Sequence, residues 1–147
     1  MKFRFVIAFA AVFSAIGVGG LSNFRKAESA GRANFGAKCA IQSFQTAFEQ
    51  SKAVFVGEVV GEEKAGDTRV FDFKVEKFWK GANAKRLEIY VYETARFQAW
   101  FKKGDRYLVY AGADDNGQLS VSKCSRSRDI ELAEEDLQKL GKGKTPR

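Results

Sequence analysis

The residues with the most distinctive chemistry are two cysteines, Cys39 and Cys124, the only pair in a chain of 147 residues that contains no histidine. Without histidine the chain lacks the usual general base, the Ser-His and Cys-His nucleophile arrangements and the commonest metal ligand. Two cysteines alone cannot form a structural zinc site. We therefore expect no enzyme activity, no metal and no cofactor, and instead a disulfide between Cys39 and Cys124.

A second candidate is Asp114-Asp115-Asn116, because carboxylate and amide oxygens are ligands that calcium prefers. A calcium loop needs further ligands at alternate positions and a closing glutamate, and the sequence does not supply them. Gly117 follows directly, and β-branched and aromatic runs lie on both sides of the turn. The spacing predicts a β-hairpin over residues 104–124 with a polar turn at its tip.

The N-terminal segment, residues 1–29, has the pattern of a secretory signal, because Lys2 and Arg4 precede an apolar run over residues 5–18. We predict cleavage after Ser29 and a secreted or periplasmic protein. An uncleaved anchor stays open, since the apolar residues 5–21 reach the lower limit of about 17 for a membrane span. Membrane association is expected only in that case.

The net charge of +7 is distributed unevenly along the chain. The leader before Ser29 carries +3, the tail after Gly141 carries +3, and the residues between them carry only +1. Lysines and glutamates alternate along the predicted strands rather than gathering on one face. A phosphate-binding surface is therefore not expected, and we predict no nucleic-acid partner.

The apolar periodicity divides the rest of the chain into a linker (residues 30–38), one folded domain (39–140) and a solvated basic tail (141–147). Within the domain, spacings of three and four predict a short helix that contains Ile41 and ends near Gln50, and a second helix around Leu132 to Leu140. Strands are predicted at 53–60, 68–77 and 87–91 and in the hairpin, with a turn over 61–67. The fold class is mainly β: a five-stranded OB-like Greek-key barrel with a short N-terminal helix and a C-terminal helix.

The predicted core follows the period of two along each strand. The first and fourth strands are apolar on both sides, so their inward faces are the least determined. The loop over residues 93–103 contains three aromatic residues, Phe97, Trp100 and Phe101. We predict that they plug an open end of the barrel; the alternative is that they form a binding surface. Leu137 is expected to cover one opening. The predicted core residues are Val54, Val56, Phe71, Phe73, Val75, Leu87, Ile89, Val91, Leu108, Tyr110, Leu119 and Val121.

Taken in order, several segments resemble the netrin-like modules, the family that includes the tissue inhibitors of metalloproteinases and their bacterial relatives. The resemblance covers residues 39–140, and it implies the OB-like barrel of that family. The segments that carry it are Cys39, Gln45–Phe48 with Ala53–Val59, Phe73–Val75 with Trp79–Gly81, Gly104–Ala111, and Gly117–Leu119 with Cys124–Ser127.

The sequence departs from that family at the group that caps zinc. Family inhibitors begin with Cys-X-Cys, and the first cysteine offers its free amine and carbonyl to the zinc of the protease while a disulfide to a loop cysteine holds it. Here Cys39 matches the second cysteine, Ala37 occupies the first position, and Phe97 lies near the loop partner. The resemblance therefore implies the fold without the zinc-capping group.

By resemblance the chain is a secreted protein-binding module, a metalloproteinase inhibitor by family but without the N-terminal zinc-chelating cysteine. We expect a monomer that binds a protein, with a metalloproteinase among the candidates. The predicted partner-binding edge consists of Ala37, Lys38, Cys39, Ala40, Phe97 and Trp100.

The alternative is an envelope or extracellular structural or interaction module that binds a protein or an oligosaccharide. An oligosaccharide or a single-stranded nucleic acid would bind the strand face at Tyr90 and Tyr92, beside Lys85 and Arg86. We rank binding at this strand face third, because export removes the protein from most nucleic acid and the net charge of the folded part is small.

Overall fold

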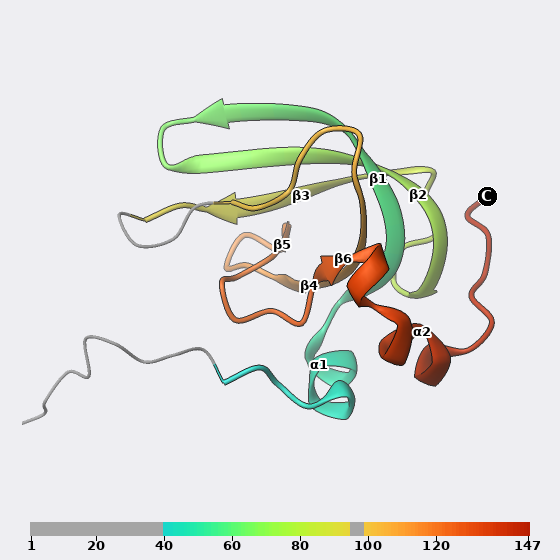
Figure 1. Cartoon of the computed structure of the whole chain (residues 1–147). Helices are drawn as coiled ribbons and strands as arrows, with labels where there is room; N and C mark the ends of the chain where they lie inside the picture. Colours follow the sequence, from blue (N-terminus) through green and yellow to red (C-terminus); the bar gives the residue numbers. More distant parts are fainter. Residues whose placement is uncertain (1–39, 95–98) are drawn as a thin grey trace, which may run out of the picture. The chain divides into compact units, whose positions relative to one another are not determined.

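The computed structural model describes residues 40–94 and 99–147 (Figure 1), and the expected signal peptide and linker lie outside them. The fold is mainly β, as predicted. The elements are α1 (Phe44–Gln50), β1 (Ala53–Ala65), β2 (Thr68–Lys80), β3 (Arg86–Tyr92), β4 (Arg106–Ala113), β5 (Leu119–Ser120), β6 (Arg128–Asp129), the 3-10 helix η1 (Ile130–Leu132) and α2 (Glu134–Leu140).

Five of the six strands close into a ring. β1 pairs antiparallel with β2, β2 with β3, and β4 with both β1 and β5. The pair that closes the ring, β3 with β5, is parallel and joins Tyr90 to Ser120. β6 pairs with β4 outside the ring, and the sequence pattern did not predict it. The predicted five strands are therefore all present, with one short addition.

β1 and β2 are the longest strands, each of 13 residues, and they curve strongly (Figure 1). The sequence predicted a turn over residues 61–67, but the pairing continues to Ala65 opposite Thr68. The register shifts between Val56 and Gly57 and again between Val59 and Gly61. Such bulges bend a strand without ending it, which is why a glycine that reads as a turn lies inside β1.

The predicted hairpin turn is confirmed. Asp114 accepts a hydrogen bond from Gly117 N at 3.0 Å through its carbonyl, and its Oδ1 accepts from Asn116 N at 2.9 Å and Gln118 N at 2.8 Å. Gly117 adopts φ 78°, which favours glycine. The carboxylate of Asp114 therefore caps its own turn.

The core has two layers, and this corrects the predicted faces of β1 and β4. The ring encloses Phe55, Val59 and Val109 together with the predicted Phe71, Phe73, Val75, Ile89, Val91 and Val121. Val54, Val56, Leu108 and Tyr110, predicted to point inward, instead form a second cluster with Ala47 and Ala133. Leu137 packs against this second cluster rather than covering an opening of the ring. Both faces of β1 and β4 are apolar because each strand lies between the two layers.

Phe101 fills the ring, as predicted for the aromatic loop. Its side chain is 3% exposed, and its ring centroid lies 5.3 Å from that of Phe71, 5.1 Å from Phe73 and 4.8 Å from Tyr107, all edge to face. Trp100 packs tilted on Phe101 with centroids 4.9 Å apart. Phe97 lies outside the described residues.

The helices are shorter than predicted. α1 begins at Phe44, where the Ser43 side chain caps Thr46 N, so Ile41 precedes the helix and is 66% exposed. Leu132 belongs to η1 and is 69% exposed. The end of α2 is as predicted, since Gly141 at φ 63° donates to Leu137 O.

The C-terminal tail differs from the predicted solvated segment. Lys144 exchanges two backbone hydrogen bonds with Phe78 of β2, both of 2.8 Å. The tail is therefore held against the edge of β2.

Candidate protein-binding edge

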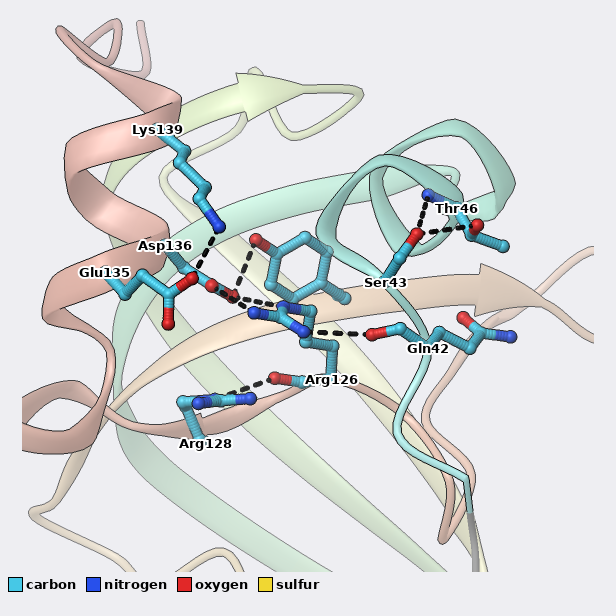
Figure 2. Close-up of polar contacts among 9 residues, drawn as sticks. Gln42, Ser43, Thr46, Arg126, Arg128, Glu135, Asp136 and Lys139 are labelled. Atoms are coloured by element: carbon cyan, nitrogen blue, oxygen red, sulfur yellow. Dashed lines mark hydrogen bonds and ion pairs between the residues drawn. The ribbon is translucent and has the colours of Figure 1, made fainter.

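The described part of the candidate site is built around an ion pair between Arg126 and Asp136 (Figure 2). Arg126 Nε donates to Asp136 Oδ2 at 2.7 Å and Nη2 donates to Oδ1 at 2.6 Å. The Tyr110 hydroxyl donates to Oδ2 at 3.1 Å. The side chain of Asp136 is fully buried and that of Arg126 is 11% exposed. The carboxylate thus accepts three hydrogen bonds away from water, the condition under which a buried charge is tolerated.

Three elements bring these groups together. Asp136 lies in the first turn of α2, which packs on the outer cluster. Tyr110 lies on the outer face of β4. Arg126 belongs to a turn that docks on β4 through Ser127, whose Oγ accepts from Tyr110 N at 2.8 Å, while Ser127 N donates to Ser125 Oγ at 2.9 Å.

The local electrostatics keep the network in one protonation state. Burial raises the pKa of Asp136, but the hydrogen bonds and charge of Arg126 outweigh it and the pKa lies below its ordinary value. The hydrogen bond with Asp136 raises the pKa of Arg126. Burial, with the nearby Asp136 charge, raises the pKa of Tyr110 well above its usual range. At neutral pH Arg126 and Asp136 therefore form an ion pair, and the neutral Tyr110 hydroxyl donates a hydrogen bond to Asp136.

The same arginine holds the segment that follows Cys39 in sequence. Arg126 Nη1 donates to the backbone carbonyl of Gln42 at 2.9 Å, and Figure 2 shows the guanidinium between Asp136 and Gln42. The Gln42 side chain donates from Nε2 to Gln50 Oε1 at 3.0 Å, across α1. The entry to α1 is therefore fixed to α2 and β4 through one side chain.

A polar pocket of about 220 Å³ lies beside this network. Among the residues that line it are Gln42, Ser122, Cys124, Ser125 and Arg126. Cys124 is not a free cysteine. Its predicted partner, Cys39, lies outside the described residues, so the pairing stays a prediction.

The structure describes two of the six residues of the predicted edge. Ala40 is exposed and stands two residues before Gln42. Trp100 is half-buried and packs on Phe101. Ala37, Lys38, Cys39 and Phe97 lie outside the described residues, so the edge as a whole stays a prediction.

The two tyrosines of the alternative site lie among carboxylates rather than cations. Tyr92 is 44% exposed and its hydroxyl bonds to Asp114, while the Tyr90 hydroxyl donates to Glu88 Oε2 at 3.2 Å. Arg86 stands at the other end of β3, where its Nη1 lies 2.5 Å from Asp72 Oδ2. The cations are therefore not placed to neutralise a polyanion stacked on Tyr92.

Sequence reasoning missed the roles of Arg126, Asp136 and Tyr110. Arg126 was part of the Cys124–Ser127 motif and Asp136 one of three acids that begin α2, but nothing in either pattern links them. The usable signal was Tyr110, a phenol on a strand apolar on both faces, because a buried hydroxyl needs a polar partner.

Within residues 40–94 and 99–147 no group of three or more His, Cys, Asp or Glu side chains could hold a metal ion. Of the helices in these ranges, none has the length and apolar character to cross a membrane. Comparison of the chain with protein-family models and with curated proteins finds no match.

Proposed function

We propose that residues 39–140 form an OB-like Greek-key barrel of the netrin-like type. The strand order supports this, because β4 returns to lie beside β1 in the sequence β4-β1-β2-β3, the order of a Greek key. A ring of five strands is also the size of an OB barrel. The segments that resemble netrin-like modules supply a second and independent argument for the same fold.

We infer that the protein is a secreted protein-binding module that uses the edge next to Cys39. The observation that carries this is the bond from Arg126 to Gln42, which holds the segment after Cys39 in one position before any partner arrives. A binding segment that is already ordered avoids the conformational cost of binding. Ile41, 66% exposed beside this bond, offers an apolar side chain that could enter the core of an interface.

Binding through this edge does not use the zinc-capping chemistry of the family. That chemistry needs a chain-terminal amine held rigidly by a disulfide, so that the amine and the neighbouring carbonyl replace the zinc-bound water. Ala37 stands where the amine-bearing cysteine would be. Cleavage near Ser29 also leaves about nine residues ahead of Cys39. The partner would therefore be bound by side chains of the edge.

The test is inhibition of a panel of zinc proteases by the mature protein and by the Ile41→Asp variant. Leu132→Asp is the matched control, because Leu132 is equally exposed but lies in η1. We expect inhibition that survives acetylation of the N-terminal amine, falls with Ile41→Asp and is kept with Leu132→Asp. Sub-micromolar inhibition that requires the free amine would overturn the proposal. Absence of inhibition throughout the panel would reject a metalloproteinase partner.

The alternative, an interaction module that binds an oligosaccharide, is favoured by Tyr92. Its ring is one of few large apolar groups exposed among the described residues. The carboxylates beside it could accept hydrogen bonds from sugar hydroxyls. Loss of binding to a neutral oligosaccharide array in Tyr92→Ala, with Ile41→Asp unaffected, would support this function instead.

A further inference from the structure

The C-terminal tail is built into the fold rather than left in solvent. Besides the paired backbone bonds between Lys144 and Phe78, Trp79 Nε1 donates to Gly141 O at 3.1 Å. At the chain end, Arg147 N donates to Asn83 Oδ1 at 3.3 Å. The tail therefore runs alongside the end of β2 and the turn after it.

Gly143 makes this close approach feasible. A Cβ atom at this position would lie 3.0 Å from the Trp79 ring and 3.2 Å from Lys77 Cβ. Both distances are tighter than ordinary side-chain contacts, so a larger residue would displace the tail from β2. The position of the tail against β2 thus depends on Gly143, and a substitution at this residue can test that dependence.

The end of β2, the turn after it and the tail carry an excess of positive charge; Glu76, just before them, pairs with Arg106. Residues 77–87 and 141–147 contain seven basic residues and no acidic residue. Arg86 pairs with Asp72, and Lys80 donates to the carbonyl oxygens of Phe48 and Glu49. The others are exposed, and within the described ranges none of them forms an ion pair; we call them the tail surface: Lys77, Lys85, Lys142, Lys144 and Arg147.

We propose that the tail surface binds an acidic polysaccharide. The tail is fixed to the end of β2 and the turn after it at three points, through Gly141, Lys144 and Arg147. Several exposed cations on such a fixed segment suit a linear polyanion, whose bound counterions are released when the protein neutralises its charges. Because the backbone of the tail is already fixed, binding needs to order only the side chains of its cations.

Other polyanionic partners fit this surface less well. Surface binding to a membrane normally adds apolar side chains that enter the lipid, but the large apolar groups exposed among the described residues are Ile41, Tyr92 and Leu132, none of them in the tail surface. Single-stranded nucleic acid is held by stacking on exposed aromatic rings, but Phe78 and Trp79, the rings beside the tail, are both half-buried. An acidic polysaccharide needs neither feature.

The proposal is independent of the edge near Cys39. It uses the end of β2 and the tail, whereas the proposed protein-binding edge uses the segment before α1 and the loop that contains Trp100. A variant of the tail surface should leave any protease inhibition unchanged, and Ile41→Asp should leave polysaccharide binding unchanged. The failure of one proposal is therefore distinguishable from the failure of the other.

The experiment measures binding of the full-length chain to polygalacturonate, with the fully methyl-esterified polymer as the neutral control. We expect binding to polygalacturonate only, weakening steeply with salt. The triple variant Lys142→Gln/Lys144→Gln/Arg147→Gln should bind about tenfold or more weakly. Its slope of log Kd against log salt should fall, by about 2 if each lost contact counts as on a single-stranded nucleic acid, at about 0.7 per contact.

Two further variants distinguish binding at the tail surface from a general effect of the net charge of the protein. Lys102→Gln/Lys103→Gln/Lys123→Gln removes three exposed charges elsewhere and should change the affinity less than twofold. Gly143→Leu keeps every charge but displaces the tail, and it should weaken binding about as much as the loss of one or two contacts. Equal effects of the two triple variants, or wild-type affinity in Gly143→Leu, would overturn the proposal. So would tighter binding, through the same cations, to single-stranded DNA or to phosphatidylglycerol vesicles.

Discussion

Replacing Arg126, which lies just beneath the surface, by methionine should strongly destabilise the domain. The variant keeps most of the side-chain volume but leaves the Asp136 carboxylate fully buried with only the Tyr110 hydroxyl as a described side-chain partner. Removal of one partner of a buried pair costs about 3–5 kcal/mol because the remaining charge is uncompensated. Arg126 is only 11% exposed, so solvent screening reduces this little. A domain of this size has about 5–15 kcal/mol in total.

Urea denaturation is the appropriate assay. With a slope of about 1–3 kcal/mol per molar urea, the midpoint should fall by at least about 1 M. The double variant Arg126→Met/Asp136→Leu removes the stranded charge as well, and it should recover more than half of the loss. A loss below about 1 kcal/mol in Arg126→Met, or losses of the two single variants that simply add in the double variant, would refute the reasoning.

The pH dependence gives a second check with a defined sign. The pKa of Asp136 is lowered in the folded protein, so the pair contributes stability above the unfolded pKa, about 3.9, and loses it as the pH falls through the folded value. Without Arg126, burial alone would raise the pKa of Asp136. The stability difference between wild type and Arg126→Met should therefore shrink on acidification, because protonation removes the stranded charge in the variant.

Three further outcomes are expected. Thiol titration of the denatured, unreduced protein should find no free thiol, and two reactive thiols would contradict a Cys39–Cys124 disulfide. Phe73→Ala should cost about 3–5 kcal/mol in urea denaturation, because Phe73 is fully buried against Phe55 and Phe101; under 1 kcal/mol would contradict its place in the ring. The backbone bond from Ala99 and the bond from Lys64 lower the pKa of Glu93 to about 2, so wild type should lose stability between about pH 4.5 and 2, and Glu93→Gln should lose less over that range.

The inward faces of β2 and β3 could be predicted because one side of each strand meets polar surroundings. Phe71, Phe73 and Val75 alternate with Asp72 and Lys74, so the period of two allows only one inward face for this strand. β1 and β4 offer no such contrast. Their second apolar face exists because α1 and α2 cover it, and a helix that covers a strand from far along the chain leaves no mark within the strand itself.

The candidate site could be predicted only in part for a related reason. The sequence placed the edge near Cys39 by resemblance, but the side chain that fixes the next segment, Arg126, lies 84 positions from its acceptor Gln42. The acceptor is a backbone carbonyl, and a carbonyl is present at every residue. No pattern of residue types can therefore identify this bond before the fold is known.

The tail shows where a polar composition misleads. Residues 141–147 have neither a helical nor a strand period and no large apolar residue, which predicted a solvated segment. β3, however, pairs with β2 only as far as Arg86 opposite Lys74, so the last residues of β2 have an edge that β3 does not reach. Unpaired backbone groups on a sheet edge are satisfied by any extended segment within reach, whatever its side chains. A short segment of glycine and lysine can meet that need, and the edge it covers then determines where its charges lie.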